Sequence, residues 1–342
     1  MRSGTRPMAK PTIDDIARRA GTSKATVSRV LNGKPDVDPE TRRRIAEIVR
    51  ELRYVPSPAA TGLAHGRPNL IGMLVPSLAW AWVLEVIRGV AERLEATPHE
   101  LVMFTTSSEE RNEVIFERTL ASGLTAGLVA IVPPGALAHI SEMHGRGFPV
   151  ALIDDRADHP DLPSVVAANF QGAYMATAHL VELGHRRIGF VNGPTEYGCN
   201  QERRRGYESA LGAAGLRSDP SLVREGDFAR PGGRRATKEL LALPEPPTAI
   251  FAANDLMAFG AGEAAAAAGL RIPDQISIVG FDDIPEARFS RPALTTIRQP
   301  LYQMGARAVD LLLAQVEGHE LSETRIELPT ELIARETTSL VS

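Results

Sequence analysis

Residues 12–33, TIDDIARRAGTSKATVSRVLNG, predict two short helices joined by a tight turn. Apolar residues recur at helical spacing in the first half, which gives the first helix one apolar side: Ile13, Ile16, Ala17 and Ala20. Gly21 then ends that helix, and the hydroxyl of Ser23 is placed to cap the next one. The stretch therefore predicts a helix-turn-helix.

The second of these helices has one apolar side and one side of small and basic residues. Val27, Val30 and Leu31 share the apolar side, because each residue advances about 100° around the helix axis. The other side carries Lys24, Ala25, Ser28 and Arg29. A short helix of this kind, held by its apolar side, fits a DNA major groove. A surface helical hairpin is the alternative, but the order ATVSRVLNG after a GTS turn favours DNA binding.

Asp38 and Pro39 predict the start of a third helix, with Asp38 as its N-cap. An apolar stripe on this helix closes a three-helix headpiece over residues 1–56: Ile45, Ile48, Val49 and Leu52. Residues 57–67 are rich in glycine and proline and make a poor autonomous helix. By composition alone they form an interdomain linker.

The charge of the chain is divided unevenly along its 342 residues. Residues 1–67 hold fourteen Lys/Arg and seven Asp/Glu, a net charge of +7, whereas the remainder has a net charge of −11. A basic segment on an acidic body indicates a polyanionic partner for the first segment only. A merely solvated basic face is the alternative, and the helix pair weighs against it.

Composition also excludes several classes of protein. Cys199 is the only cysteine, so an intrachain disulfide and a cysteine-based zinc site are excluded, as suits a reducing cytosol. No apolar run approaches the roughly 20 residues that span a bilayer. The start, MRSGTRPMAKP, lacks the apolar segment of a secretory signal. We therefore expect a cytoplasmic protein without a membrane partner.

From residue 70 onward, apolar strands alternate with amphipathic helices. The predicted strands are LIGMLVP (70–76), ELVMFTT (100–106), GLVAIVP (127–133), PVALID (149–154), RIGFVNG (187–193), TAIFAAN (248–254) and ISIVGFD (276–282). Such alternation predicts βαβ units and parallel sheets. At this length, two or three compact units are expected.

Four strings follow the headpiece in a characteristic order: GHRRIGFVNGP (184–194), NDLMAFG (254–260), VGFDDIP (279–285) and RPALTTIRQP (291–300). With them, the sequence resembles the lactose-repressor (LacI/GalR) family of bacterial transcription regulators over nearly its whole length. The resemblance implies an all-α helix-turn-helix headpiece and a hinge helix, joined to a two-lobed α/β domain built like periplasmic binding proteins, with parallel sheets.

The resemblance also implies how the domain over residues 68–342 is divided. The first lobe is expected at about 68–158 and 288–322, and the second at about 159–287 and 323–342, with three chain crossings between them.

For DNA, the resemblance implies that Lys24, Ala25 and Arg29 read bases and that Thr26 and Ser28 meet phosphates. The rest of the expected DNA-contacting set is Thr12, Ser23, Asn32, Tyr54 and Leu63. In the family, the segment matching 57–67 becomes a hinge helix when it is paired with its twin on DNA. Leu63 occupies the position of the leucine that opens a base step in the minor groove. Thr61, where the family usually has a basic residue, and Gly62 depart from the pattern.

Ligands of open parallel sheets sit beyond the carboxyl ends of the strands, where Asp154, Asn254 and Asp282 are expected. A lone carboxylate there can equally be a structural cap, as Asp255 is expected to be at the start of a helix. The effector-binding residues that the resemblance adds are Arg203, Phe228 and Trp82. Arginine and aspartate bind adjacent hydroxyls and an aromatic ring covers a sugar's apolar face, so a carbohydrate effector is expected. Trp80 and Trp82 can also be core or subunit-contact residues.

Enzymatic activity is not expected. The sequence has no GxSxG turn, no GxxxxGK phosphate loop and no HExxH metal pair. Adjacent carboxylates such as Asp282 and Asp283 diverge at a strand end, whereas a glycosidase needs a gap of about 5–9 Å between its two carboxylates. We expect neither a cofactor nor a metal.

The sequence is therefore identified as that of a ligand-controlled transcription factor, foremost a repressor. The expected partners are double-stranded operator DNA, a small-molecule effector such as a sugar or oligosaccharide, and a second copy of the chain, with a tetramer as the alternative. Two other interpretations stay open. In the first, a ligand or protein partner strengthens DNA binding. In the second, the chain is a solute-binding protein, which predicts an export signal and no headpiece, and the sequence contradicts both expectations.

Overall fold

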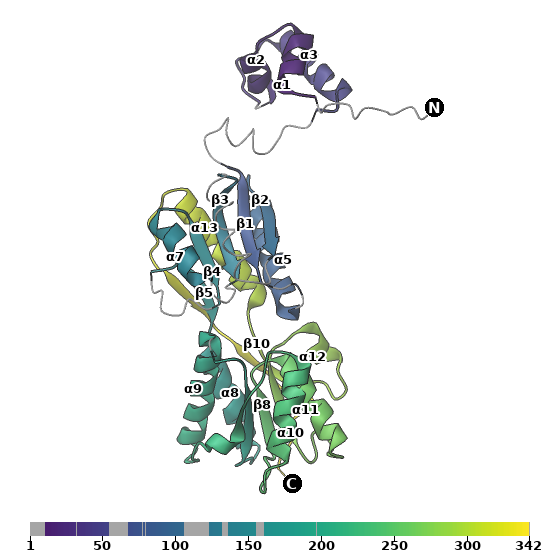
Figure 1. Cartoon of the computed structure of the whole chain (residues 1–342), viewed down its shortest axis with the longest axis vertical. Coiled ribbons are helices and arrows are strands. Elements are labelled where there is room, and N and C mark those ends of the chain that lie inside the picture. The colour runs from purple at the N-terminus through teal and green to yellow at the C-terminus, as the bar shows by residue number, and fades with distance from the viewer. Residues whose placement is uncertain are drawn as a thin grey trace, which may run out of the picture. The chain divides into compact units, whose positions relative to one another are not determined.

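The computed structural model describes residues 11–31, 33–54, 68–76, 78, 80–105, 123–131, 136–154, 161–195 and 197–341. The chain divides into two compact units, one within residues 1–68 and one within residues 69–342. Figure 1 shows the helices and strands of both units.

The first unit is a three-helix headpiece made of α1 (Ile13–Ala20), α2 (Lys24–Leu31) and α3 (Pro39–Glu51). Ile16, Val27 and Ile45, one from each helix, have no exposed surface and form its core. The predicted caps are confirmed: the Ser23 hydroxyl accepts the Thr26 N–H at 3.1 Å, and the Asp38 carboxylate accepts the Thr41 N–H at 2.9 Å. Local sequence thus sets both helix starts.

The second unit contains two six-stranded sheets. The first sheet is parallel throughout, in the order β11-β5-β4-β3-β1-β2. Its strands are β1 (Leu70–Val75), β2 (Glu100–Thr105), β3 (Thr125–Ile131), β4 (Val150–Ile153), β5 (Ser164–Ala167) and β11 (Arg325–Leu328). Its helices among the described residues are α5 (Ala81–Glu95), α7 (Leu137–Gly145) and α13 (Leu301–Val316). Together they form the first lobe.

The second sheet has the order β12-β10-β9-β8-β6-β7, and only the β12–β10 pair is antiparallel. Its strands are β6 (Ile188–Asn192), β7 (Val223–Glu225), β8 (Ala249–Ala252), β9 (Ser277–Asp282), β10 (Thr295–Arg298) and β12 (Glu331–Ile333). Its helices are α8 (Asn169–Glu182), α9 (Gly198–Ala213), η1 (Pro220–Leu222), α10 (Arg230–Leu241), α11 (Asp255–Ala267) and α12 (Pro285–Phe289). Together they form the second lobe.

Helices cover both faces of the second sheet (Figure 1). Two successive residues of β9 show this, since neighbouring side chains of a strand point to opposite faces. Gly280 faces Ala258 of α11, whereas the ring of Phe281 packs against Gly172 of α8. A strand covered on both faces is buried along its whole length, which explains the continuous run IVGF in β9.

The three expected crossings between the lobes are present, but each comes later in the chain than predicted. The chain leaves the first sheet after β5, the second sheet after β10, and the first sheet again after β11. The predicted lobe boundaries were therefore wrong for these three strands: β5 and β11 belong to the first lobe and β10 to the second. In each case, one more short strand pairs with the sheet before the chain crosses.

All seven strands predicted from apolar runs are confirmed. The strands that were not predicted have three or four residues each: β5, β7, β10, β11 and β12. None of the described helices combines the length and the apolar character that a bilayer span requires.

Candidate functional site

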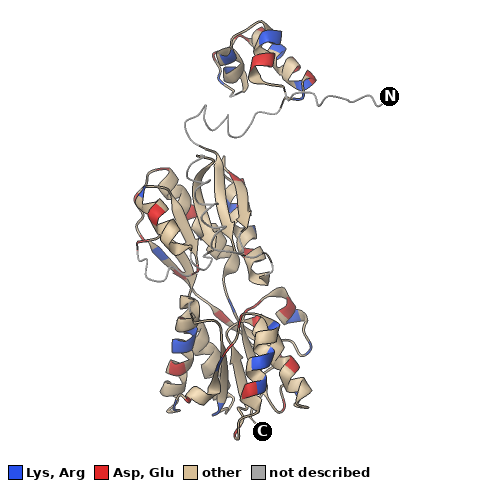
Figure 2. Ribbon diagram, in the orientation of Figure 1, with Lys and Arg blue, Asp and Glu red and all other residues tan. Residues whose placement is uncertain are grey.

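The outward side of α2 is one candidate site. Lys24, Ala25 and Arg29 are exposed there, while Val27 is fully buried against the other headpiece helices. Lys24 Nζ lies 2.7 Å from the Asp14 carboxylate, and Arg29 pairs with Asp36. These ion pairs are half-exposed and therefore weak, so an approaching polyanion can replace them. Figure 2 shows basic and acidic residues on the headpiece helices.

The other residues predicted to contact DNA have mixed surroundings. Thr12 and Ser23 are exposed and cap α1 and α2, and the Thr26 hydroxyl lies 2.9 Å from that of Ser23. Ser28 is half-buried on α2, and Tyr54 packs its ring against the headpiece core. Asn32 and Leu63 lie outside the described residues.

Arg203 of α9 is the centre of a second candidate site, in the second lobe. It is 3% exposed, and its Nε donates to the side-chain oxygen of Asn169 at 2.9 Å. A second guanidinium nitrogen donates to the carbonyl of Ala253, just past β8. The guanidinium also lies 3.8 Å from the centre of the Phe281 ring, which gives it a cation–π contact. The arginine is therefore held in one orientation from three sides.

Asp282, at the carboxyl end of β9, faces this arginine. Its Oδ1 lies 4.0 Å from Arg203 Nη1 and accepts a 2.7 Å hydrogen bond from the side chain of Gln299. Burial raises the pKa of Asp282 to about 7, although the nearby Arg203 charge and the Gln299 hydrogen bond act to lower it. The structure thus brings together the two charged residues that the sequence predicted for an effector cleft.

Asn254 and Phe228 are adjacent and have local structural roles. The Asn254 side-chain oxygen caps α11 through Met257 N–H at 2.9 Å, and its side-chain amide donates to the Phe228 carbonyl at 3.0 Å. Phe228 has a left-handed backbone with φ of 62°, and its ring meets the Tyr197 ring edge-on at 5.5 Å. These contacts hold an aromatic pair beside the β8 end. Asp255 begins α11, as predicted.

The other two predicted effector residues, Asp154 and Trp82, belong to the first lobe. Asp154 follows β4 with φ of 79°, and its charge is close enough to raise the pKa of Asp282 further. Trp82, in the first turn of α5, stacks on Trp80 with 6.1 Å between ring centres, and both pack on the core of the first lobe.

Three residues of this region were not predicted: Asn169 and Gln299, which bond Arg203 and Asp282, and Tyr197, whose ring contacts Phe228. Gln299 comes directly after β10 and Asn169 two residues after the end of β5, and neither short strand was predicted. The rule that polar residues past strand ends line a cleft would have found both, had those strands been recognised.

A groove of about 510 Å³ opens beside Asp282 and is lined by both lobes. Glu85 and Arg88 of α5 and Tyr302 of α13 line it from the first lobe, and Asp282, Asp283 and Arg288 from the second. The described residues hold no group of three side chains suited to a metal ion. With its charged side chains and the amide of Gln299, the groove is suited to a polar ligand.

Two parts of the chain match models of known protein families. Residues 12–57 match the family model described as bacterial regulatory proteins, lacI family, and residues 177–338 match a periplasmic binding protein-like domain. Catabolite control protein A of Priestia megaterium is 31% identical over 96% of this chain and 99% of its own length. The chain belongs to the LacI family of bacterial regulatory proteins.

Solved structures of LacI-family proteins agree with the fold. The Lac repressor dimer bound to operator and the anti-inducer ONPF has a TM-score of 0.86 and 31% identity, covering 97% of this chain and 100% of that one. The transcriptional regulator CelR in complex with cellobiose has a TM-score of 0.75 and 31% identity, covering 96% and 99%. This LacI-family chain is a DNA-binding regulator of transcription, and its relatives are regulators rather than enzymes.

Proposed function

We propose that this protein is a repressor that binds a palindromic operator as a homodimer and is released when a small carbohydrate enters the cleft around Arg203 and Asp282. The observation that carries the proposal is the buried pairing of these two side chains at 4.0 Å, in a chain that also has a DNA-reading headpiece. We expect it to act in the cytoplasm, where operator DNA lies.

The chemistry of the cleft suits vicinal hydroxyl groups. A guanidinium donates and a carboxylate accepts, so two adjacent hydroxyls can bridge Arg203 and Asp282. Gln299 and Asn169 already bond these two side chains and limit their rotation. The aromatic pair of Phe228 and Tyr197 offers a surface for the apolar face of a sugar ring.

The relatives support the class of ligand and the assembly. One is a Lac repressor dimer bound to operator, and another is a regulator in complex with cellobiose. By the same proposal, Lys24, Ala25 and Arg29 read base edges from α2, and Thr26 and Ser28 meet phosphates. Leu63 is proposed to wedge into the central base step.

The test uses the full-length protein and a thermal-shift screen with cellobiose, ribose, purines and phosphosugars, since a ligand of the native state raises its melting temperature. Calorimetry then gives the affinity, and operator binding is measured with and without the ligand that the screen identifies. Weaker operator binding with ligand supports release. Stronger binding would instead make the ligand a co-repressor.

Arg203→Ala should remove effector binding, because it deletes charge-assisted hydrogen bonds worth about 1.5–3 kcal/mol each. Arg204→Ala is the matched control: Arg204 neighbours Arg203 on α9 but is 44% exposed and pairs with Glu208. Both variants should bind operator through their unchanged headpieces. Retained ligand affinity in Arg203→Ala would show that the cleft lies elsewhere.

A further inference from the structure

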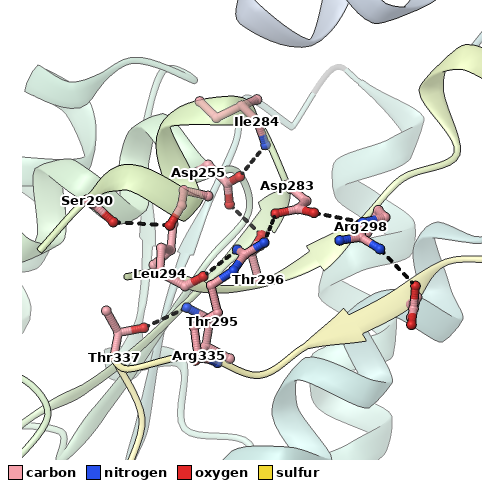
Figure 3. Close-up of polar contacts among 12 residues, drawn as sticks. Asp255, Asp283, Ile284, Ser290, Leu294, Thr295, Thr296, Arg298, Arg335 and Thr337 are labelled. Atoms are coloured by element: carbon pink, nitrogen blue, oxygen red, sulfur yellow. Dashed lines mark hydrogen bonds and ion pairs between the residues drawn. The ribbon is translucent and has the colours of Figure 1, made fainter. Parts of the chain in front are cut away.

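The turn that follows β9 carries a strained backbone. Asp282 has φ of 120° and Asp283 has φ of 57°, both in the region that favours glycine. Such a backbone conformation is unfavourable for a residue other than glycine and persists only where its surroundings hold it. The position of the cleft carboxylate Asp282 therefore depends on the contacts that fix this turn (Figure 3).

Asp255 holds the turn from the α11 side. It is completely buried, and its carboxylate accepts the Ile284 N–H at 2.9 Å and the Thr296 hydroxyl at 2.5 Å. The contact is close: a Cβ on Gly280 of β9 would lie 2.2 Å from Asp255 Oδ1. Asp255 thus joins the turn to the middle of β10.

Asp283 holds the same turn from the other side. Its carboxylate is 6% exposed and accepts from two guanidinium groups, Arg298 Nε at 2.7 Å and Arg335 Nη2 at 2.5 Å. Arg298 also bonds Glu331 at 3.2 Å, and Arg335 bonds the Leu294 carbonyl at 2.8 Å. A buried carboxylate with two such partners forms strong, directional bonds.

The partners of Asp283 lie where the chain crosses between the lobes. Arg298 is the last residue of β10, directly before the second crossing, and Glu331 is the first residue of β12, directly after the third. Arg335 lies two residues beyond the end of β12. Asp283 therefore ties the turn that bears Asp282 to two of the three crossings, as Figure 3 shows for Arg298 and Arg335.

We propose that Asp283 is a positioning residue that couples the cleft carboxylate Asp282 to the crossing strands through Arg298 and Arg335. A ligand that pulls on Asp282 moves the turn, and the two ion pairs transmit this movement to the crossings and hence to the angle between the lobes. Asp283 borders the groove, but Arg298 and Arg335 occupy its two carboxylate oxygens and its side chain is only 6% exposed, so it does not bind the ligand itself. The inference rests on the proposed function, because it takes Asp282 to be an effector residue.

Asp283→Asn tests this coupling with little change of shape, because asparagine tolerates the left-handed backbone but carries no charge. Arg335→Gln removes the opposite partner. Asp274→Asn is the control, since Asp274 is 62% exposed in the same lobe and pairs with Arg271 on the surface. The full-length variants are studied with a palindromic DNA site selected on the wild-type protein, and with cellobiose as the probe.

Two measurements are made on each variant. Calorimetry gives the cellobiose Kd, and titration gives the operator Kd with and without cellobiose. Effector coupling is typically about 5–150-fold in affinity. We expect Asp283→Asn and Arg335→Gln to keep the cellobiose Kd within about threefold and to lose most of the cellobiose effect on operator Kd, with Asp274→Asn unchanged. The proposal would be overturned if cellobiose changed the operator Kd of the variants as much as that of the wild-type protein. It would also be overturned if weaker cellobiose binding fully explained the lost effect.

Hydrogen exchange of the ligand-free proteins separates this inference from the proposed function. In Asp283→Asn, we expect faster exchange in peptides covering 282–290 and also in those covering both crossings, 296–301 and 328–334. Faster exchange in the turn alone would overturn the coupling, whether or not cellobiose binds. Failure of cellobiose to bind the wild-type protein would count against the sugar effector, and the exchange result would still decide the role of Asp283.

Discussion

Arg29 is the exposed cation at the end of α2, and its only described ion pair is with Asp36. A guanidinium can bind the O6 and N7 atoms of guanine together, so it carries sequence information that a phosphate contact does not. We predict that Arg29→Ala weakens operator binding by about 1–3 kcal/mol and relaxes preference at one base pair in each half-site.

A binding selection on random DNA measures that preference directly. Arg18→Ala is the control, because Arg18 is 79% exposed on α1 and pairs with Asp15. If Arg29→Ala selects the same site as the wild-type protein, Arg29 does not read a base.

The raised pKa of Asp282 should make sugar binding depend on pH. Burial raises this pKa to about 7, so a large share of the carboxyl group is protonated in neutral solution. A sugar whose hydroxyls donate to the carboxylate binds the ionised form, so its affinity should rise as the pH increases from about 6 to 8 and then level off.

Calorimetry over this range measures the effect in the wild-type protein. Asp282→Asn should bind the sugar weakly and with no such slope. A slope of the same size in Asp282→Asn would assign the titration to another group.

The helices α5 and α13 cross in close contact at two glycines, Gly89 and Gly305. A Cβ on Gly305 would lie 2.2 Å from the Val86 carbonyl oxygen, and one on Gly89 would lie 2.0 Å from that of Tyr302. Backbone cannot move aside as a flexible side chain can. We predict that Gly305→Ala lowers the free energy of unfolding by about 1–3 kcal/mol.

Denaturant unfolding monitored by circular dichroism measures this change. Gly212, in α9, has no atom within 4 Å of its would-be Cβ, so Gly212→Ala is the matched control. It should stabilise the protein by about 0.5–1 kcal/mol, because alanine is the better helix former. Equal effects of the two changes would contradict the close helix crossing.

Two histidines of the second lobe contact the C-terminal segment of the chain, at Thr338 and Ser339. His185 Nε2 donates to the Ser339 carbonyl at 3.2 Å, and His179 Nε2 lies 3.0 Å from the Thr338 hydroxyl. Burial lowers the pKa of both imidazoles below 6.5. The folded protein therefore favours the neutral forms.

A lowered histidine pKa means that the unfolded chain binds more protons, so these two groups destabilise the fold as the pH falls below about 6.5. The raised pKa values of Asp255 and Asp282 act with the opposite sign, because the folded protein keeps their protons as the pH rises. The histidine effect is therefore measured as the difference in the free energy of unfolding between His185→Gln and the wild-type protein. We predict that His185→Gln becomes more stable relative to the wild-type protein as the pH falls from about 7 to 5, so that the difference in their free energies of unfolding shifts in favour of the variant. A constant difference would show that His185 does not titrate in this range.

The sequence alone determined the headpiece, because its signals are local. The caps Ser23 and Asp38 and the apolar stripes lie within about forty consecutive residues, and the structure has the helices where they indicate. The long strands were equally clear, since a strand covered by helices on both faces is apolar throughout. The motifs in family order gave Arg203 and Asp282 as cleft residues.

Tertiary structure decided the rest, through contacts between residues far apart in the chain. The strands β10 and β11 have four residues each, and only the open sheet edge that each one meets determines its lobe. The contacts of Asp283 show the same dependence, because its partners Arg298 and Arg335 lie 15 and 52 residues away. The local sequence pattern indicates the type of an element and its caps. A buried ion pair depends instead on how the folded chain brings distant charged residues together.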